Sequence, residues 1–402
     1  METQVWEYFL LVFALISAVV SWYVLTRHKT KRPYYVKAER DWHKRKAAAE
    51  SHIDYSVFLI GDAGANTREN PEPTLDILRN QLLESGKQSA VFFLGDNIYP
   101  KGMVEPEHKL YNEAVESLMS QLHIVDDYLG RVCIISGNHD WNKGRKGGLR
   151  AVLRQQDFVD DYFGNESVFL PRNGCPGPTE IKLTEDLTAI IINTQWWVHN
   201  GKRPIGKKDG CNINSEEEFF ETLKKILDRN KSRKVLVAGH HPMYSKASHG
   251  GKFDPKQHIF PLTAIHKKAY VPLPVAGSLY PMYRKFIGAR EDISHPLYRR
   301  MRKKMLQIFR QYPNLVYAAG HDHNLQYIRK GKQHYIVSGA GSKVTYVTKG
   351  KGAAFTHAHK GFFRINYLST GEVNIEAWEP NIDGSPRLAY RGHIEQSRAA
   401  RP

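Results

Sequence analysis

Five short apolar runs in this 402-residue chain each lead into a glycine that is followed by polar side chains. The runs lie at Val57–Ile60, Ala90–Leu94, Val132–Ile135, Val235–Ala238 and Leu315–Ala319. Apolar runs of this length predict buried strands, and their alternation with amphipathic stretches predicts an α/β domain. Because the carboxyl ends of parallel strands meet at one edge of a sheet, we expect the five loops to converge on a single site.

The remaining periodic segments complete this α/β pattern. Two further apolar runs, Ala189–Ile192 and Tyr335–Val337, are predicted strands. Helices are expected near Thr74–Glu84, Glu107–Leu122, Gly148–Tyr162, Ser215–Arg229 and Pro296–Tyr312. Ser215 followed by Glu218 resembles a capping box at a helix start.

The five loops carry carboxylate, amide, imidazole and phenol groups and no thiolate. They read Gly61-Asp62-Ala63-Gly64, Gly95-Asp96-Asn97-Ile98-Tyr99, Gly137-Asn138-His139-Asp140, Gly239-His240-His241 and Gly320-His321-Asp322-His323. This donor set suits a pair of divalent or trivalent metal ions such as iron, zinc or manganese. A pair of ions about 3.5–4 Å apart activates a hydroxide and stabilises an in-line phosphoryl displacement. A single such turn is usually structural, but five behind strand-like runs predict a dimetal site.

In this order the motifs resemble those of the calcineurin-like metallophosphoesterase superfamily, and within it the purple acid phosphatase branch. Gly64 stands where most members have the His of an Asp-x-His motif, and Tyr99 is present in the second loop. The runs VAGHHPMYSKASHG and GHDHNLQY, with SGAG further on, are similar to the small tartrate-resistant type. The resemblance spans roughly Tyr55 to Glu379 and implies a four-layer αββα sandwich of two mixed sheets.

The resemblance also implies seven metal ligands. One ion would be held by Asp62, Asp96, Tyr99 and His323, and the other by Asp96, Asn138, His240 and His321, with Asp96 bridging. A phenol must lose its proton to bind a metal, which a hard ferric ion promotes better than zinc. The implied pair is therefore Fe(III) with Fe(II), Zn(II) or Mn(II).

Three further residues are expected to act in catalysis. His139 would stabilise the reacting phosphorus and protonate the leaving group, with Asp140 orienting its ring. His249 matches a histidine outside the ligand set in the tartrate-resistant type and is expected to contact phosphate. His241 departs from that type, where an aromatic residue follows the metal-binding His; it is either an added proton donor or phosphate contact, or a buried structural imidazole.

An uncharged stretch of 18 residues, Tyr8–Leu25, has the minimum length of a membrane-spanning helix. Trp6 and Trp22 near its ends resemble interfacial aromatic belts. We therefore expect an uncleaved single-pass anchor over residues 1–26. A cleaved signal peptide is the alternative, although the residues before the run carry acids and no Lys or Arg.

The net charge of +17 is concentrated in two segments. Arg27–Lys46 carries a net +7 within an expected juxtamembrane linker at 27–52, which suits acidic lipid headgroups. Lys267–Arg310 carries a net +9 and overlaps a Gly-, Pro- and Tyr-rich insertion at about 250–300, expected to be a long functional loop or lid. Charge this localised disfavours a nucleic-acid groove.

The side of the membrane stays open, because the positive-inside rule favours a cytoplasmic catalytic domain whereas purple acid phosphatases are typically exported. Cys175 and Cys211 would pair in an oxidising compartment. The catalytic domain is expected over 53–380, followed by a peripheral tail, 381–402, with little apolar content.

The leading expectation is a dinuclear-metal phosphoesterase that hydrolyses a phosphate monoester by attack of a metal-bound hydroxide. One alternative is a phosphodiesterase or lipid-phosphate hydrolase whose basic insertion holds the substrate at a membrane surface. The other is an inactive, membrane-tethered scaffold, against which the complete set of seven ligands argues.

Overall fold

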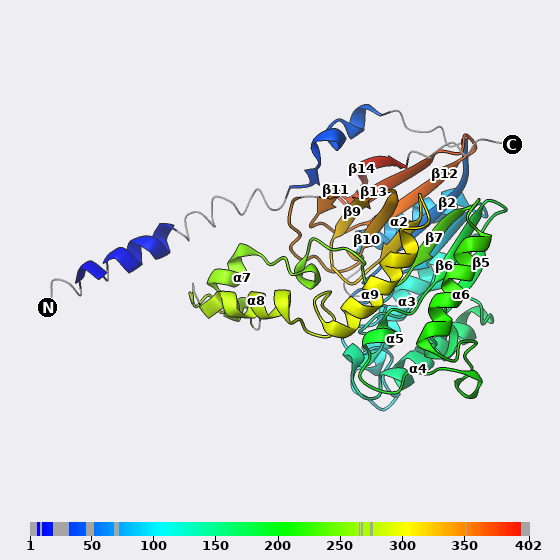
Figure 1. Ribbon diagram of the computed structural model, residues 1–402, viewed down its shortest axis with the longest axis horizontal. Coiled ribbons are helices and arrows are strands. Elements are labelled where there is room, and N and C mark those ends of the chain that lie inside the picture. Colours follow the sequence, from blue (N-terminus) through cyan, green and yellow to red (C-terminus); the bar gives the residue numbers. More distant parts are fainter. Residues whose placement is uncertain are drawn as a thin grey trace.

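The computed structural model describes residues 6–8, 10–18, 32–45, 52–67, 72–264, 266, 268–273, 276–350 and 352–394, and its main body contains two packed mixed sheets (Figure 1). The six-stranded sheet has the order β14-β13-β12-β2-β3-β4. Its strands are β2 (Ile53–Ile60), β3 (Ser89–Phe93), β4 (Arg131–Ile134), β12 (Phe362–Leu368), β13 (Val373–Pro380) and β14 (Pro386–Ile394). Strands β2, β3 and β4 run parallel, and the other neighbours pair antiparallel.

The eight-stranded sheet has the order β1-β11-β9-β10-β8-β7-β6-β5. Its strands are β1 (Tyr34–Tyr35), β5 (Thr179–Lys182), β6 (Leu187–Ile191), β7 (Lys234–Ala238), β8 (Val316–Ala319), β9 (Leu325–Lys330), β10 (Gln333–Ser338) and β11 (Ala353–His357). Strands β6, β7, β8 and β10 are parallel. Both sheets therefore present a row of parallel carboxyl ends.

Alternating side chains of the central strands face two different cores. Val57 and Leu59 of β2 lie in the core between the sheets, together with Leu236 of β7. Phe58 and Ile60 face the opposite way, onto helices. Burial on both faces explains why these strands read as continuous apolar runs.

Helices cover the outer face of each sheet. The core outside the six-stranded sheet includes side chains of α2 (Pro73–Ser85), α3 (Tyr111–Leu122) and α4 (Gly148–Phe163). The core outside the eight-stranded sheet includes side chains of α5 (Gln195–Val198), α6 (Glu216–Arg229) and α9 (Pro296–Phe309). The order of layers is thus helices, sheet, sheet, helices. All seven predicted strands and all five predicted helices are confirmed, and Ser215 caps α6 by accepting from the Glu218 N–H at 3.1 Å.

The insertion at 250–300 is more ordered than expected. It contains two short helices, α7 (Pro255–Ile259) and α8 (Leu279–Phe286), and ends where α9 begins at Pro296. In Figure 1 this segment projects from the side of the main body. Two short helices thus occur within the predicted long functional loop or lid, because local helical turns satisfy backbone groups that a loop would leave to water.

The predicted single-pass membrane localisation is wrong. Among the residues that the structure describes, no helix has both the length and the apolar character needed to cross a bilayer. Within the predicted anchor, residues 6–8 and 10–18 are described and helical, whereas 1–5, Phe9 and 19–26 lie outside the described residues.

Both ends of the described main body are also more integrated than predicted. In the predicted linker, Tyr35 of β1 pairs with Phe355 of β11, and its hydroxyl donates to the Ala389 carbonyl at 2.8 Å. In the predicted tail, β14 pairs with β13, and Tyr390 is buried between the sheets. Both segments therefore contribute a strand to the sheets, Tyr34–Tyr35 and Pro386–Ile394; 27–31, 46–51 and 395–402 lie outside the described residues.

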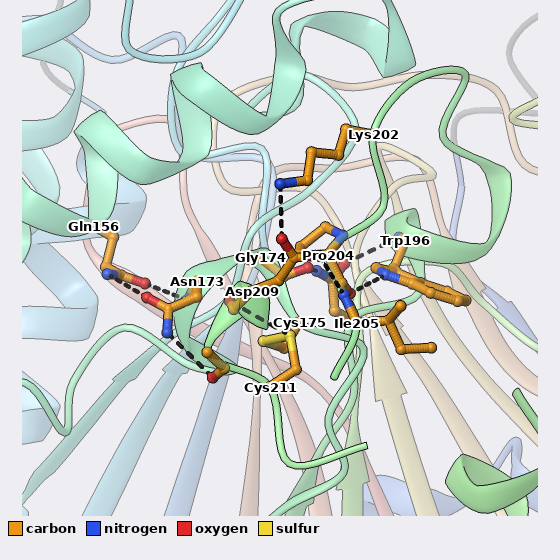
Figure 2. Close-up of a disulfide and its surroundings, with 12 residues drawn as sticks. Gln156, Asn173, Gly174, Cys175, Trp196, Lys202, Pro204, Ile205, Asp209 and Cys211 are labelled. Carbon is orange, nitrogen blue, oxygen red and sulfur yellow. Dashed lines mark hydrogen bonds and ion pairs between the residues drawn. A yellow bond between two sulfur atoms is a disulfide. The ribbon is translucent and has the colours of Figure 1, made fainter. Parts of the chain in front are cut away.

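A disulfide joins Cys175 to Cys211, the pair that the sequence left open (Figure 2). It connects the segment after α4 to the loop before α6. The same loop is held by a hydrogen bond from the Trp196 indole to the Pro204 carbonyl at 2.8 Å and by an ion pair between Lys202 and Asp209. These contacts fix the chain that follows β6.

Candidate metal centre

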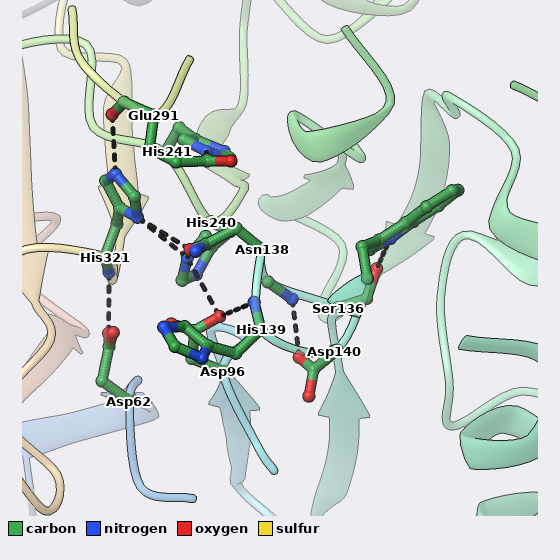
Figure 3. A network of polar contacts seen from close by, with 12 residues as sticks. Asp62, Asp96, Ser136, Asn138, His139, Asp140, His240, His241, Glu291 and His321 are labelled. Carbon is green, nitrogen blue, oxygen red and sulfur yellow. Dashed lines mark hydrogen bonds and ion pairs between the residues drawn. The ribbon is translucent and has the colours of Figure 1, made fainter. Parts of the chain in front are cut away.

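All five glycine-led loops lie at the carboxyl ends of parallel strands, three from one sheet and two from the other (Figure 3). Asp62, Asp96 and His321 adopt left-handed backbone conformations, with φ of 58°, 54° and 72°. Such conformations cost about 1–3 kcal/mol each for non-glycine residues and cluster at functional sites. A Cβ added to Gly137 would lie 2.3 Å from the Asp96 carboxylate, so only glycine allows this approach.

The first group of side chains meets around the Tyr99 hydroxyl. That oxygen lies 3.1 Å from Asp62 Oδ1, 3.2 Å from Asp96 Oδ2 and 3.2 Å from His323 Nε2. A phenol has one proton and can donate it to only one of these three acceptors. Two carboxylates, an imidazole and a phenol therefore converge on one point.

The second group meets around the Asn138 amide oxygen. Asn138 Oδ1 lies 2.9 Å from His240 Nε2 and 3.0 Å from His321 Nδ1, and these two nitrogens are 3.2 Å apart. Asp96 Oδ1 lies 3.4 Å from His240 Nε2, whereas Asp96 Oδ2 faces Tyr99. Asp96 thus has one oxygen toward each group.

The donor chemistry of the second group fits a cation. His240 donates its Nδ1–H to the Leu94 carbonyl at 2.8 Å, and His321 donates its Nε2–H to the Glu291 carbonyl at 2.9 Å. The nitrogens that face Asn138 then carry lone pairs, so three acceptors point at one another. In protein metal sites, one ring nitrogen of a histidine ligand gives its lone pair to the metal, and the other ring nitrogen typically donates its N–H to a carbonyl or carboxylate. The residues present therefore fit a metal ion.

Burial sets the protonation of both groups in the absence of a cation. It raises the pKa of Asp62 well above its usual range, and the Asp96 carboxylate adds to the rise. Burial, and then the two carboxylates, raise the pKa of Tyr99. Burial lowers the pKa of His323 to about 4 and that of His321 well below its usual range, so both rings are neutral and able to ligate.

His139 stands at the edge of the first group. Its backbone N–H donates to Asp96 Oδ1 at 2.8 Å, and its ring packs edge-on against Tyr99 at 4.3 Å between centroids. The ring Nδ1–H donates to the Pro100 carbonyl at 2.8 Å, which leaves Nε2 toward the site. Burial lowers the pKa of His139, against the opposing charge of Asp96.

The predicted role of Asp140 in orienting His139 is wrong, because Pro100 makes that contact. The Asp140 carboxylate is fully buried and accepts backbone N–H bonds from Gly137 at 2.7 Å, Asn97 at 3.1 Å and Ile98 at 3.1 Å. Asp140 therefore ties the loop after β3 to the loop after β4. It positions Asp96 and Asn138 through the backbone.

His249 comes to the second group from the insertion side. Its ring lies 4.0 Å from the His321 ring, and its Nδ1 is 2.9 Å from Asp292, which Arg284 also binds at 2.6 Å through Nε. Burial lowers the pKa of His249, but the bond to Asp292 and the negative charges of Asp322 and Asp292 together outweigh it, and the net direction is upward. The segment that carries Arg284 and Asp292 thus forms a wall of the metal centre.

His241 is a buried structural imidazole, one of the two alternatives that the sequence left open. Its Nδ1 lies 2.9 Å from the Thr194 hydroxyl and its Nε2 lies 3.0 Å from the Glu291 carboxylate. The side chain is fully buried, so neither ring nitrogen is open to substrate.

Sequence reasoning missed Lys343 and the insertion residues at this site. Lys343 Nζ lies 3.0 Å from the centroid of the Tyr99 ring. The only sequence signal for it is its place two residues after the Ser338–Gly341 run. The Glu291 carbonyl that holds His321 has no side-chain signature at all.

Two mixed sheets whose parallel strands end in a shared cluster of metal donors define the class of metallophosphoesterase folds. The chain belongs to the calcineurin-like phosphoesterase family, whose sequence profile matches residues 41–325. Purple acid phosphatase PPD1 from yellow lupin (Lupinus luteus) seeds has a similar structure, with a TM-score of 0.51 at 14% identity over 86% of this chain and 54% of that chain. At this identity the likeness shows the fold alone.

Among curated proteins, the chain is similar to tartrate-resistant acid phosphatase type 5. The Sus scrofa protein is 23% identical over 257 residues, which cover 63% of this chain and 58% of that protein. The Oryctolagus cuniculus protein is 24% identical over 257 residues, covering 63% of this chain and 61% of that protein. The chain thus spans about 60% of the length of these relatives.

Proposed function

We propose that this protein is a dinuclear-metal phosphoesterase that hydrolyses phosphate monoesters. The observation that carries the proposal is the convergence of seven buried or half-buried donors in two groups that share Asp96. Family membership and the similarity to tartrate-resistant acid phosphatases support it. The catalytic unit of this proposal includes β1 and β14 and extends beyond 53–380.

The two groups suit different ions. Asp62, Tyr99 and His323, with Asp96, form a hard donor set for Fe(III), whereas Asn138, His240 and His321 suit Fe(II), Zn(II) or Mn(II). When bound, the pair would activate the attacking water and neutralise charge on the phosphate oxygens.

The chain's own residues orient the substrate and move a proton. When its ring is doubly protonated, His139 carries a proton on the Nε2 that faces the site, where it would hold a phosphate oxygen and give that proton to the leaving oxygen. His249, fixed by Asp292, would contact the phosphate from the other side. Asp140 keeps the two ligand loops in register.

A diester or lipid phosphate is the second candidate substrate. The observation that favours it is the apolar surface of α8, where Leu279 and Phe286 are largely exposed beside the cationic Lys285. Such a surface suits a bulky apolar substituent next to a phosphate. Comparing bis(p-nitrophenyl) phosphate with p-nitrophenyl phosphate decides between diester and monoester.

The proposal is tested with purified full-length protein, metal analysis and p-nitrophenyl phosphate. We expect two metal ions per chain and activity that is lost in both Asp96→Ala and Asn138→Ala. Asp161→Ala, which removes an exposed carboxylate on α4, is the matched control and should keep activity. Unchanged turnover in the two site variants would overturn the proposal.

A further inference from the structure

Lys343 lies over the face of the Tyr99 ring. Its Nζ is 3.0 Å from the centroid of that ring. Among the described residues, no carboxylate lies within 4.0 Å of the Lys343 ammonium group, whereas Arg284 on the insertion is paired with Asp292. The close contact of this cation is therefore with the aromatic ring of a proposed metal ligand.

The loop that carries Lys343 is held on both sides by the backbone of the first group. Before Lys343, the Ser342 N–H donates to the Asp62 carbonyl at 3.1 Å. After it, the Thr345 N–H donates to the His323 carbonyl at 2.7 Å. Asp62 and His323 are both proposed ligands, so the contacts that place ligands of the first group also place the cation.

The side chain of Lys343 is half-buried, unlike that of an ordinary surface lysine. Burial lowers the pKa of Lys343, and the negative charges of Asp96 and Asp62 oppose that change. A half-buried cation is separated from its neighbours by less water, so its attraction to an aromatic ring is stronger than at an exposed position. The contact with Tyr99 is therefore of the kind that can change the chemistry of the ring.

We propose that the Lys343 ammonium group sets how strongly the Tyr99 phenolate donates electrons to the metal ion of the first group. The negative charge of a metal-binding phenolate extends into its ring, and a cation over the ring attracts that charge. The phenolate then donates less, and the ion keeps more positive charge with which to activate the attacking water. Lys343 acts through Tyr99 and is not itself a catalytic residue. The inference rests on the proposed function, because it takes the ion at Tyr99 to be Fe(III).

The contact predicts a direction for the tyrosinate-to-iron absorption band. This transition moves an electron from the phenolate to Fe(III). Lys343 Nζ lies over the centre of the ring, whereas an ion at the phenol oxygen would lie beyond the edge of the ring. The cation therefore lowers the energy of the electron donor more than that of the acceptor. Removal of the cation should lower the energy of the transition.

The test uses visible absorption spectra of full-length, iron-loaded protein. Lys343→Met removes the charge and keeps an unbranched side chain, so the band should shift to longer wavelength. Lys343→Arg keeps a cation that can stack on the ring, so its band should stay near the wild-type position. Stepwise chemical reduction gives a second readout. Loss of a nearby positive charge favours the ferric state, so the potential at which the band bleaches should fall in Lys343→Met.

Two further variants with the same loss of charge test whether the contact itself matters. Lys143→Met removes an exposed lysine whose charge acts on the nearby His139 ring, and Lys349→Met removes an exposed lysine farther along the chain. Neither variant should move the band. Equal shifts in Lys143→Met and Lys343→Met would mean that a general change of charge suffices, and would overturn the contact. The circular dichroism spectrum of each variant checks that it is folded.

The outcomes separate this inference from the proposed function. A wild-type band that does not move in Lys343→Met would rule out the role of Lys343 and leave the phosphoesterase function standing. Absence of the band from iron-loaded wild-type protein would rule out that role together with the assignment of Fe(III) to the first group. If the band shifts as expected but the wild-type protein does not hydrolyse p-nitrophenyl phosphate, the role of Lys343 stands and the proposed function fails.

Discussion

The two groups of the metal centre are held in place by different parts of the chain. Asp62, Tyr99 and His323 come from the loops of the two sheets, and Lys343 stands over Tyr99 from another such loop. The group of Asn138, His240 and His321 is closed instead by the insertion, whose Glu291 carbonyl and Asp292–His249 pair pack against His321. One half thus depends on the sheets alone, and the other also depends on an added segment.

Because only the second group contacts the insertion, the two groups should differ in how strongly a change in the insertion affects them. The sheet loops are fixed by backbone contacts such as those of Asp140 and Ser342. The insertion reaches the centre through a few contacts, above all the Glu291 carbonyl and the Asp292 side chain that Arg284 binds. Changes in the insertion are therefore expected to affect the second group and leave the first intact.

The largest effect is expected where the two groups meet. Asp96→Asn removes the charge of the carboxylate whose two oxygens face the two groups, so both ions should be lost together. Activity on p-nitrophenyl phosphate should fall by about a thousandfold or more. Metal analysis of dialysed protein checks this, with Asp161→Asn as control. Retention of both ions in Asp96→Asn would contradict the claim that both groups depend on Asp96.

Asn138→Ala should separate the halves. It removes the oxygen at the centre of the second group and touches nothing in the first. We expect one ion per chain in place of two, and activity lower by about a hundredfold or more. Loss of both ions would mean that the first group does not stand without the second.

Much of the fold was predictable because each central strand is marked by a short run of neighbouring apolar residues in the sequence. The run Val57–Ile60 is buried on both faces and is followed by Gly61. A run of this kind predicts a strand and a loop at the carboxyl end of that strand. Strand β12 was missed because its apolar run is interrupted by polar side chains. Asn366 is buried beside Ser56 at 2.8 Å, and such pairing appears only once distant segments are together.

The site divides in the same way. The seven proposed ligands lie in the loops that directly follow predicted strands. The motifs in these loops, and the order of the motifs along the chain, were enough to propose them. Lys343, Asp292 and the Glu291 carbonyl act from loops without periodicity. Tertiary contact alone gives them a role, and the sequence could not reveal it. The contact of His139 with Pro100 in place of Asp140 is of the same kind.

A smaller effect is expected from loosening the insertion. Asp292→Asn weakens the pair with Arg284 and the hold on His249. Outer contacts of this kind typically change metal affinity or activity by about 10–100-fold. Titration of the two ions should show weaker binding at the second group only. Arg300→Met, which removes an exposed ion pair with Glu216 on α6, is the control. Equal weakening at both groups would contradict the division.

The smallest effect on turnover is expected at Tyr99. Tyr99→Phe removes the phenol oxygen of the first group but leaves its carboxylates and His323. Activity should fall by less than about tenfold, while the tyrosinate-to-iron absorption of the iron-loaded protein disappears. An unchanged absorption band would place iron elsewhere.

The central claim is one centre with two halves that share Asp96, and anomalous X-ray diffraction from metal-loaded crystals tests it most directly. The account predicts two peaks. One should lie among Asp62, Tyr99 and His323, the other among Asn138, His240 and His321, and both should be within ligand distance of Asp96. A single peak, or two peaks of which one does not contact Asp96, would contradict it.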